Sequence, residues 1–473
     1  MADGVSDGLG DAGGFDDPTL DDLGPLGGVM SFAEANEWLN RHINREAVAG
    51  DWDTLSLVGP ERLMAIMGDP HRAFPVIHVT GTNGKGTVSR MIERLLSAAG
   101  LTVGVFASPH LESITERMSR SGDDITESEF GEVIGGIAAM EAMFDSTPSY
   151  FELLTAAAFR WFSDTAVDVA VVEVGIFGRF DATNVVDAEV AVITNVGKDH
   201  TDGEGEWQQK IAFEKAGIIK PDSAVVLGPV ADELASIFSA EPHRVLFRAE
   251  TDFELTDRQV AVGGQMLAVH TPFGDLDEVY LPLHGEHQGE NAAIALMAAE
   301  AFFGRALQAE IVQTAMAAVE GPGRFEVISV EPLVVLDTAH NVPAAAAVVD
   351  TLNSEITVSG TRIAVVGMLE RNADEVLAAF DIASFDVVIA CTPDSGRAIP
   401  APDLAASARA LGASAEVVPT VADAVERALV IAGELDLILI TGSAYTVGEA
   451  RRHLRTAFEA RAPEQPAGRV YED

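Results

Sequence analysis

The stretch from residue 76 to residue 96 constrains the fold more than any other part of this chain. It begins with a short apolar run, Val76 to Thr80, which is typical of a buried parallel strand. From Val88 onward the apolar residues recur at every third or fourth position, as they do in an amphipathic helix. A buried strand followed at once by such a helix is the unit from which α/β folds are built. The stretch therefore predicts an α/β protein with a parallel sheet.

The loop between this strand and this helix reads G-T-N-G-K-G-T. It consists of Gly81, Thr82, Asn83, Gly84, Lys85, Gly86 and Thr87. Glycines let backbone N–H groups close around phosphate oxygens, and the helix N-terminus and Lys85 add positive charge. The loop departs from the general pattern G-x-x-x-x-G-K-[ST], because Gly86 separates Lys85 from Thr87. We interpret it as a phosphate-binding loop, in preference to a glycine-rich turn that binds no ligand.

Length and composition exclude several classes of protein. A chain of 473 residues that is 48% hydrophobic is expected to form two or three domains with real cores. The net charge of -44 argues against nucleic acid as a partner, because this surface would repel its phosphates. The single cysteine, Cys391, excludes disulfides and thiolate zinc sites. The sequence contains neither a signal peptide nor an apolar run long enough to span a membrane, so we expect a soluble cytoplasmic protein without a membrane partner. We also expect it to be a monomer.

Lysine is rare among the 30 basic residues of the chain. The lysines are Lys85, Lys198, Lys210, Lys215 and Lys220. A chain with such a preference for arginine keeps a lysine mainly where a compact or deprotonatable amine is needed. For Lys210 and Lys220, chance clustering on a solvated helix is an equally good explanation.

Breaks in the pattern divide the chain into four parts. Residues 1–30 are rich in Asp and Gly and carry no basic residue, which predicts an acidic disordered tail. Residues 31–319 form a first α/β domain around the phosphate loop, and we expect Val225 to Leu283 to be a small β-rich lobe within it. Residues 320–323, Glu-Gly-Pro-Gly, are the best hinge candidate. In residues 324–473 short apolar strands alternate with helical stretches, which predicts a second doubly wound sheet.

Three predicted strands of the first domain lead into Ser108, Glu173 and His200. A buried ionisable group such as Glu173 is costly unless it is paired or binds a metal. A hydroxyl at the carboxyl end of a parallel strand points into the crevice in which α/β proteins hold ligands. Ser108 is explained equally well as a turn residue before Pro109. Together with the phosphate loop, these residues predict a magnesium–nucleotide site.

Ordered motifs along nearly the whole chain from residue 31 make a family resemblance specific. They are T-G-T-N-G-K-G-T, A-S-P-H-L, E-V-G-I-F-G-R-F-D-A-T-N, D-H-T, F-E-K-A-G-I-I-K-P, H-Q-G-E-N-A, G-R-F-E, D-T-A-H-N and T-G-S-A-Y. In this order they resemble folylpolyglutamate synthase/dihydrofolate synthase, of the Mur ligase superfamily. The resemblance implies a P-loop ATP-binding domain and a smaller Rossmann-like C-terminal domain. It also implies ATP-dependent attachment of L-glutamate to a folate or to dihydropteroate through an acyl phosphate.

The resemblance also implies roles for single residues. The phosphate loop, with Lys85, would bind ATP, and Asn291, Arg324 and Asp337 would complete the nucleotide site. The first magnesium would be held by Thr87, Ser108 and Glu173, and the second by His200. Lys215 matches the family lysine that takes up carbon dioxide, and the resulting carbamate would bind the second magnesium. The residues expected to contact substrate are Ser108, His110, Arg117, His340 and Ser443.

Departures from the family pattern keep other interpretations open. They are Phe177, Lys198, residues 202–206, residues 370–372 and Ala444. The folate ligase stays the favoured hypothesis, and the altered loops after Glu173 and His200 are the main support for a second one, a Mur-type ligase that joins an amino acid to a different carboxylate. A third hypothesis is a P-loop protein that uses ATP only as a conformational switch. In the first two, closure about residues 320–323 unites the reactants, and we expect Arg117, Arg179 and Arg324 to form a positive funnel for the anionic substrates.

Overall fold

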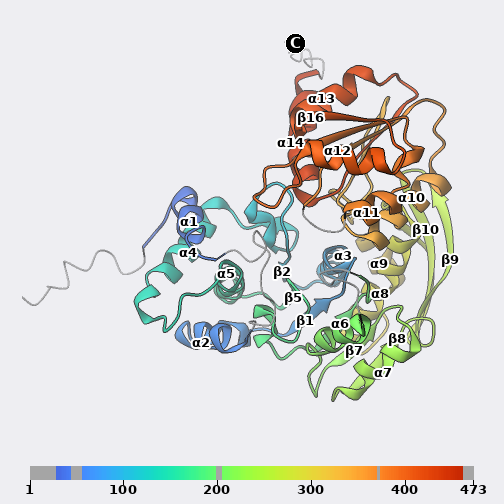
Figure 1. Cartoon of the computed structure of the whole chain (residues 1–473). Coiled ribbons are helices and arrows are strands. Elements are labelled where there is room, and N and C mark those ends of the chain that lie inside the picture. Colours follow the sequence, from blue (N-terminus) through green and yellow to red (C-terminus); the bar gives the residue numbers. More distant parts are fainter. Residues whose placement is uncertain (1–27, 44–55, 199–204, 370–372, 462–473) are drawn as a thin grey trace, which may run out of the picture.

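The computed structural model describes the chain except for residues 1–27, 44–55, 199–204, 370–372 and 462–473 (Figure 1). His200 and most of the predicted acidic tail therefore lie outside the described residues. Residues 28–30, which we predicted to belong to the tail, pack instead against helix α4 (Glu127–Ala138). Gly131 and Gly135 make this possible, because a side chain at either position would overlap the backbone of residues 28–30.

The larger sheet has eight strands in the order β4-β3-β2-β5-β1-β6-β7-β8. The strands are β1 Val76–Thr80, β2 Val103–Phe106, β3 Met118–Arg120, β4 Asp123–Asp124, β5 Val169–Glu173, β6 Val190–Ile193, β7 Ala224–Leu227 and β8 Val245–Arg248. The pairs from β2 to β8 are parallel, whereas β3 and β4 add an antiparallel edge. The predicted parallel α/β architecture of the first domain is confirmed.

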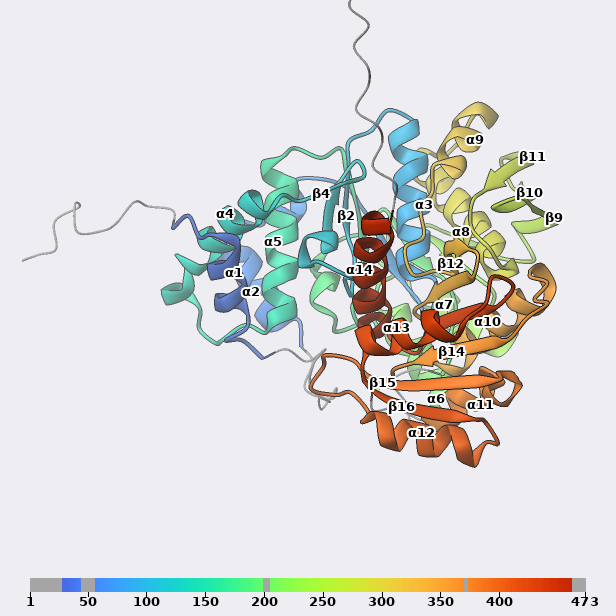
Figure 2. The ribbon, with the colours of Figure 1, turned by 90° about the horizontal axis from the view of Figure 1, so that it is seen from above.

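Helices cover both faces of this sheet. One face packs against α3 (Lys85–Ala98), α8 (Glu286–Phe303) and α9 (Ala309–Ala317). The other face packs against α5 (Tyr150–Asp164), with α1 (Phe32–Leu39), α2 (Val58–Ile66) and α4 around it, and against α6 (Trp207–Ala216) and α7 (Asp232–Ala240). Figure 2 shows α1, α4 and α5 on one side of the molecule and α9 on the other, with α3 between them. Every side chain of β1 is buried because both faces are covered, which explains why its sequence does not alternate.

The predicted β-rich lobe is smaller than we expected. Strands β9 (Glu254–Ala261), β10 (Gly264–Thr271) and β11 (Gly274–Leu281) form a three-stranded antiparallel sheet. Residues 225–248, which we assigned to the lobe, instead supply most of β7, together with α7 and β8, to the larger sheet region. The assignment was wrong there because β7 is uniformly apolar and buried, as a strand inside the larger parallel sheet is.

The C-terminal part contains a second sheet, in the order β12-β13-β17-β14-β15-β16. The strands are β12 Glu326–Val330, β13 Leu333–Asp337, β14 Arg362–Val366, β15 Val387–Thr392, β16 Ala415–Thr420 and β17 Leu437–Thr441. The helices are α10 Val342–Glu355, α11 Ala373–Ala379, α12 Ala401–Ala410, α13 Val421–Ile431 and α14 Ala444–Arg461. All pairs are parallel except β12 with β13, an antiparallel edge that the sequence pattern did not reveal. Separate apolar clusters cover the two faces, as in a doubly wound fold.

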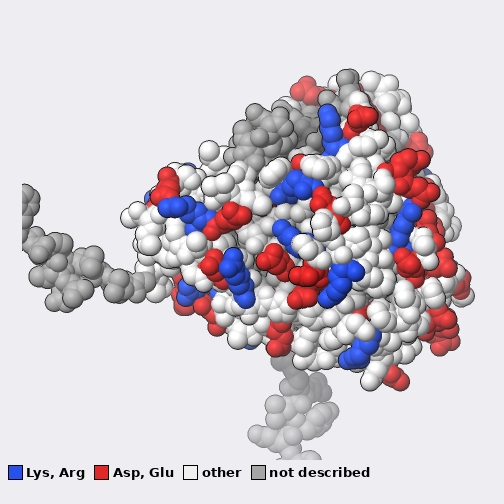
Figure 3. Space-filling model, turned by 90° about the horizontal axis from the view of Figure 1, so that it is seen from below, with Lys and Arg blue, Asp and Glu red and all other residues white. Residues whose placement is uncertain are grey.

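The structure can be compared with two expectations from composition, the absence of a membrane span and the acidic surface. Within the described part of the chain, every helix is too short or too polar to cross a bilayer. Figure 3 shows many acidic side chains on one face, with lysines and arginines interspersed among them. The cytoplasmic location and the monomeric state stay predictions.

Candidate active site between two α/β domains

A cavity of about 390 Å³ is lined by residues of both the larger and the C-terminal sheet regions. Of the residues predicted to bind ligands, the cavity is lined by Thr82, Asn83, Gly84, Lys85, Gly86, Thr87, Ser108, Glu173, Asn291, Arg324, Asp337, His340 and Ser443. They come from the loops after β1, β2 and β5, from α8, and from the loops around β12, β13 and β17. Carboxyl ends of parallel strands thus meet at one crevice, as expected for α/β proteins.

The phosphate loop is held in shape by the strand next to it. The side-chain oxygen of Asn195, just after β6, accepts hydrogen bonds from the backbone N–H groups of Thr82 (3.2 Å) and Asn83 (3.0 Å). The Thr194 hydroxyl donates to the Asn83 carbonyl oxygen at 2.6 Å. Gly81 does not line the cavity, but it must be glycine, because a Cβ there would overlap the Thr194 side chain. The loop is therefore pre-shaped to receive a ligand.

Lys85 is the first residue of α3, and Gly84 before it adopts a left-handed conformation with φ of 81°. The Lys85 ammonium lies 3.2 Å from the Gly81 carbonyl oxygen and 3.4 Å from that of Thr82. It therefore folds back over the loop. An ammonium held there can neutralise phosphate charge without entering the core.

Glu173, the last residue of β5, is only 3% exposed. Its Oε2 accepts a hydrogen bond from the backbone N–H of Ser108 at 3.2 Å. Burial raises the pKa of the Glu173 carboxyl, while the nearby Lys85 ammonium acts in the opposite direction. A Cβ on Gly86 would lie 3.2 Å from Glu173 Oε2, so the carboxylate lies directly against the phosphate loop. The phosphate loop, Ser108 and Glu173 therefore lie together, as the sequence predicted.

Asp337 organises the opposite wall. Its two oxygens accept from the backbone N–H groups of Phe325 (2.8 Å) and Ala339 (2.7 Å). Burial raises the pKa of the Asp337 carboxyl to about 6, and the Arg324 guanidinium opposes this rise. Arg324 also contacts the Thr338 hydroxyl. Asp337 therefore ties Arg324 to the segment that carries His340.

Asn83 and Asn341 connect the two walls directly. The Asn83 amide donates to Asn341 Oδ1 at 3.2 Å, and the Asn341 amide donates to Asn83 Oδ1 at 2.9 Å. Asn341 is also the N-cap of α10, where its oxygen accepts from the Ala344 N–H at 3.0 Å. The phosphate loop and the start of α10 are thus in contact across the cavity.

The start of α8 adds residues that we did not predict. His287, Gln288 and Glu290 line the cavity beside Asn291, whose amide donates to Gln288 Oε1 at 3.0 Å. Burial lowers the pKa of His287 to about 4, which keeps its ring neutral near neutral pH. All three lie in the quoted motif H-Q-G-E-N, so the motif itself was the available signal.

Other cavity residues that we missed come from both sheet regions. They include Thr194, Asn195, Thr338, Arg397 and Tyr445. Asn195 ends a strand that we predicted, so the rule that selected Ser108 and Glu173 could have found it.

Lys215, on α6, is 4% exposed and does not line the cavity. Its helix nevertheless packs under the loop that follows Glu173, because a Cβ on Gly178 would lie 3.2 Å from the Lys215 Cα. Asp181 shapes this loop by accepting from the Ile176 N–H at 2.9 Å. Within the described residues, no group of three or more His, Cys, Asp and Glu side chains could hold a metal.

His110 and Arg117, predicted to contact substrate, do not line this cavity. Arg117 is 3% exposed and donates from Nε to His110 Nδ1 at 2.9 Å. Arg179 likewise lies elsewhere, paired with Glu241 and stacked over the Phe213 ring. The expected arginine funnel was therefore wrong, since Arg324 alone of the three proposed arginines lines the cavity.

Two known protein families match the two parts of the chain that line the cavity. Residues 79–299 match the Mur ligase middle domain, and residues 323–444 match the Mur ligase, glutamate ligase domain. These ranges contain the phosphate loop and the opposite wall, respectively.

Individual relatives are similar over most of the chain. A dihydrofolate synthase/folylpolyglutamate synthase of Mycobacterium tuberculosis is 38% identical over 436 residues, which is 84% of this chain and 89% of that protein. A crystal structure of Mycobacterium tuberculosis folylpolyglutamate synthase complexed with ADP and AMPPCP has a TM-score of 0.83 and 36% identity, over 89% of this chain and 98% of that one. A crystal structure of a bifunctional folylpolyglutamate synthase/dihydrofolate synthase with Mn, AMPPNP and L-glutamate bound has a TM-score of 0.79 and 29% identity. The match covers 91% of this chain and 99% of that one. The chain therefore belongs to the dihydrofolate synthase/folylpolyglutamate synthase family of Mur ligases.

Proposed function

We propose that the protein is an ATP-dependent ligase that joins L-glutamate to a folate carboxylate. The reaction would be polyglutamylation of tetrahydrofolate, conversion of dihydropteroate to dihydrofolate, or both. The observation that carries the proposal is the shared cavity, in which Lys85 and Glu173 face Arg324, His340 and Ser443. The relatives support it by their names and by the ADP, AMPPCP, AMPPNP, Mn and L-glutamate in their structures.

Activation is needed because a carboxylate is a poor electrophile. In the proposed reaction a carboxylate oxygen of the folate attacks the γ-phosphorus of ATP, and the bond from that phosphorus to ADP breaks. The glutamate amine, after losing a proton, attacks the carbonyl carbon of the resulting acyl phosphate. The carbon–oxygen bond breaks and phosphate leaves, so that ATP, folate and glutamate become ADP, phosphate and the amide.

Lys85 and Arg324 would stabilise the charge that builds up in the first step. They approach from opposite walls of the cavity. Negative charge spreads over phosphate and carboxylate oxygens in the transition state, and fixed cations inside a partly enclosed site stabilise it more than water does.

Magnesium fits the residues at the phosphate loop. The hydroxyls of Thr87 and Ser108 and the carboxylate of Glu173 are hard oxygen donors, and all three residues line the cavity. A site with one protein carboxylate suits an ion that usually keeps waters and takes phosphate oxygens as its other ligands. When bound, the metal would draw charge from the phosphate oxygens.

For the second magnesium we propose His200, outside the described residues, and a carbamate on Lys215. Carbamylation needs a neutral amine, which burial favours in general, and Lys215 is only 4% exposed. Protein supplied with isotopically labelled bicarbonate should give a carbamate carbon signal in nuclear magnetic resonance.

The matched control for this signal is an exposed lysine on the same helix. Lys215→Arg should remove the signal, whereas Lys210→Arg, on exposed α6 surface, should keep it. A signal that survives in Lys215→Arg would contradict the assignment.

We also propose that residues 31–319 and 324–473 act as two domains that close about residues 320–323. Support comes from the separate cores of the two sheets and from a cavity lined by both. Small-angle scattering should show compaction when an ATP analogue and folate are added together, and an unchanged profile would contradict closure. We further propose that the enzyme is a monomer, which light scattering tests; residues of one chain line both walls of the cavity, so these walls need no second copy.

The proposed function is tested by ATP turnover with and without glutamate and each acceptor. Turnover that requires glutamate together with tetrahydrofolate or dihydropteroate supports the proposal. Turnover that neither folate supports, but that another carboxylate supports together with an amino acid, would favour a ligase for that carboxylate. Turnover that is indifferent to glutamate and to both acceptors would favour a P-loop switch protein.

A further inference from the structure

The loop between β2 and β3, residues 107–117, connects the cavity to the C-terminal domain. At the cavity end, Ser108 lines the site and donates its N–H to Glu173. The base of the loop is closed by the Ala107 N–H, which donates to the Arg117 carbonyl oxygen at 2.9 Å. The middle of the loop carries Leu111 and Glu112, neither of which lines the cavity.

Leu111 fits into a notch on α14. A Cβ on Gly448 would overlap the Leu111 carbonyl oxygen, so the helix and the loop backbone are in direct contact. A Cβ on Gly323, in the predicted hinge, would lie 3.4 Å from the Leu111 side chain and 3.2 Å from that of Val447. Leu111 therefore sits where the hinge and α14 meet.

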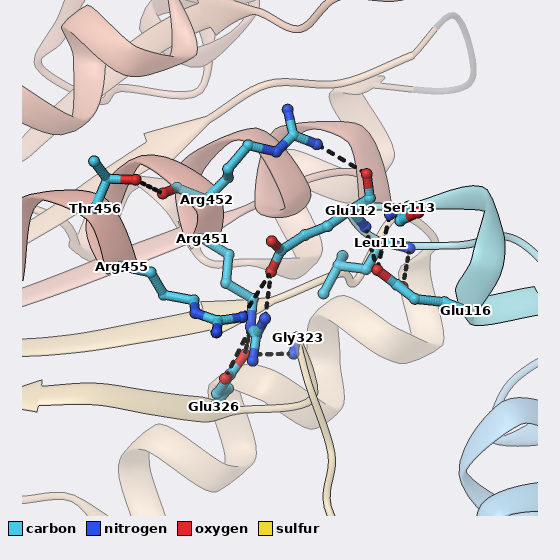
Figure 4. A network of polar contacts seen from close by, with 10 residues as sticks. All are labelled: Leu111, Glu112, Ser113, Glu116, Gly323, Glu326, Arg451, Arg452, Arg455 and Thr456. Atoms are coloured by element: carbon cyan, nitrogen blue, oxygen red, sulfur yellow. Dashed lines mark hydrogen bonds and ion pairs between the residues drawn. The ribbon is translucent and has the colours of Figure 1, made fainter. Parts of the chain in front are cut away.

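Arg451 stands between two carboxylates at this junction (Figure 4). Its Nε lies 3.0 and 2.9 Å from the two oxygens of Glu326, and its Nη1 contacts Glu112 Oε1. The Arg451, Glu112 and Glu326 side chains are only 17%, 18% and 18% exposed, so water screens these charges weakly. Glu326 Oε2 also accepts from the Gly323 N–H at 2.8 Å. Arg451 thus links the loop to the hinge.

The part of the loop that Arg451 holds is a rigid unit. The Glu116 carboxylate accepts from three successive N–H groups, those of Leu111 (2.8 Å), Glu112 (2.9 Å) and Ser113 (2.8 Å). Arg452 adds a hydrogen bond to the Glu112 carbonyl oxygen at 2.9 Å. A shift of Glu112 would therefore be passed along the backbone toward Ser108.

We propose that Arg451 is a positioning residue: it holds Ser108 and Glu173, on one wall of the cavity, in place relative to Arg324 on the other wall. The proposal rests on the proposed function. The contacts support it on both sides, because Arg324 directly follows Gly323 and Ser108 belongs to the docked loop. Without Arg451, Glu112 and Glu326 would lose the cation that lies between them, and Glu112 would keep the more distant and more exposed Arg455 at 3.9 Å. Repulsion between the two carboxylates would separate the loop from the hinge.

The test compares Arg451→Met with Arg455→Met. Arg455 lies one turn further along α14 and is 56% exposed, 3.9 Å from the same Glu112 oxygen. Arg451→Met should lower kcat for ligation about a hundredfold, the size expected when reacting groups are misplaced by about 1 Å. The KM for ATP should change little, since Arg451 does not line the cavity. The kcat of Arg455→Met should equal that of the parent. If Arg451→Met and Arg455→Met have the same kcat, the proposal is overturned.

Rescue separates positioning from mere stability. Adding Glu112→Gln to Arg451→Met removes one of the two facing carboxylates and should restore much of kcat. Arg451→Lys keeps the charge but not the planar guanidinium, so its kcat should lie between that of the parent and that of Arg451→Met. If Arg451→Met does not fold, Arg451→Lys takes its place in the comparison. Loss of kcat that Glu112→Gln does not reverse would contradict the electrostatic account.

A readout that needs no ligase activity keeps this proposal separate from the proposed function. Amide hydrogen exchange at residues 111–113 should become at least about tenfold faster in Arg451→Met but not in Arg455→Met. Unchanged exchange would overturn the docking role of Arg451. If exchange becomes faster in Arg451→Met but the parent protein ligates no glutamate, the role of Arg451 in holding the loop is supported and only the proposed function is refuted.

Discussion

Glu355, the last residue of α10, makes a buried contact between the C-terminal domain and the three-stranded sheet region. Its carboxylate pairs with Arg258 of β9, accepts from the Gly285 N–H at 2.9 Å, and lies 2.9 Å from His284 Nδ1. The side chains of Glu355 and Arg258 are 1% and 17% exposed. Replacing Glu355 with Gln keeps the shape but leaves the Arg258 charge without its partner.

The expected cost follows from this burial. Removing one partner of a buried ion pair typically costs about 3–5 kcal/mol, because the remaining charge has lost its water and its counter-ion. A glutamine can still accept from the Gly285 N–H, so we expect the lower end, about 3 kcal/mol. Lys198 and Glu375 form a matched exposed pair at 2.8 Å, with side chains 28% and 53% exposed. Glu375→Gln should cost less than about 1 kcal/mol.

Urea unfolding followed by circular dichroism measures both variants against the parent. The reasoning predicts a clearly lower midpoint for Glu355→Gln and a nearly unchanged one for Glu375→Gln. Equal losses in the two variants, or a loss below about 1 kcal/mol for Glu355→Gln, would refute the argument that burial decides the strength of these contacts.

Three further predictions concern the phosphate loop, a buried histidine and the acidic surface. Lys85→Met should abolish ligation while circular dichroism stays unchanged, and activity within about tenfold of the parent would contradict the role of the ammonium. Burial, with Lys220 nearby, lowers the pKa of His78 to about 3, and its Nδ1 has no hydrogen-bond partner. Between the ordinary pKa of 6.5 and about 3, the unfolded chain binds a proton that the folded chain does not. Stability should therefore fall by up to about 1.4 kcal/mol per pH unit as pH is lowered, and His78→Gln should flatten that slope in urea titrations. With a net charge of -44, added salt should raise the melting temperature by screening self-repulsion, and a fall would contradict this.

Local patterns predicted the elements that depend on neighbouring residues. The boundaries of β1 agree with the predicted strand, because it is an apolar run next to a turn signal. The phosphate loop and Glu173 were found because a rule on strand ends links sequence to position.

Contacts between distant residues could not be predicted in the same way. Asn83 and Asn341 are 258 residues apart, and Arg258 and Glu355 are 97 apart. Nothing in the local pattern shows that such side chains meet, because the packing of the two domains brings them together. Arg117 illustrates the opposite error, since a charged residue beside a site motif was expected at the cavity and is instead buried against His110.

The most direct test of the central claim follows an oxygen atom. The protein is given ATP, magnesium, glutamate and a folate acceptor whose carboxylate carries a heavy oxygen isotope. An acyl phosphate predicts that one labelled oxygen appears in the released phosphate, with ADP and glutamylated product formed in equal amounts. Unlabelled phosphate, released without a glutamylated product, would contradict the account, because water would then be the group that attacks ATP.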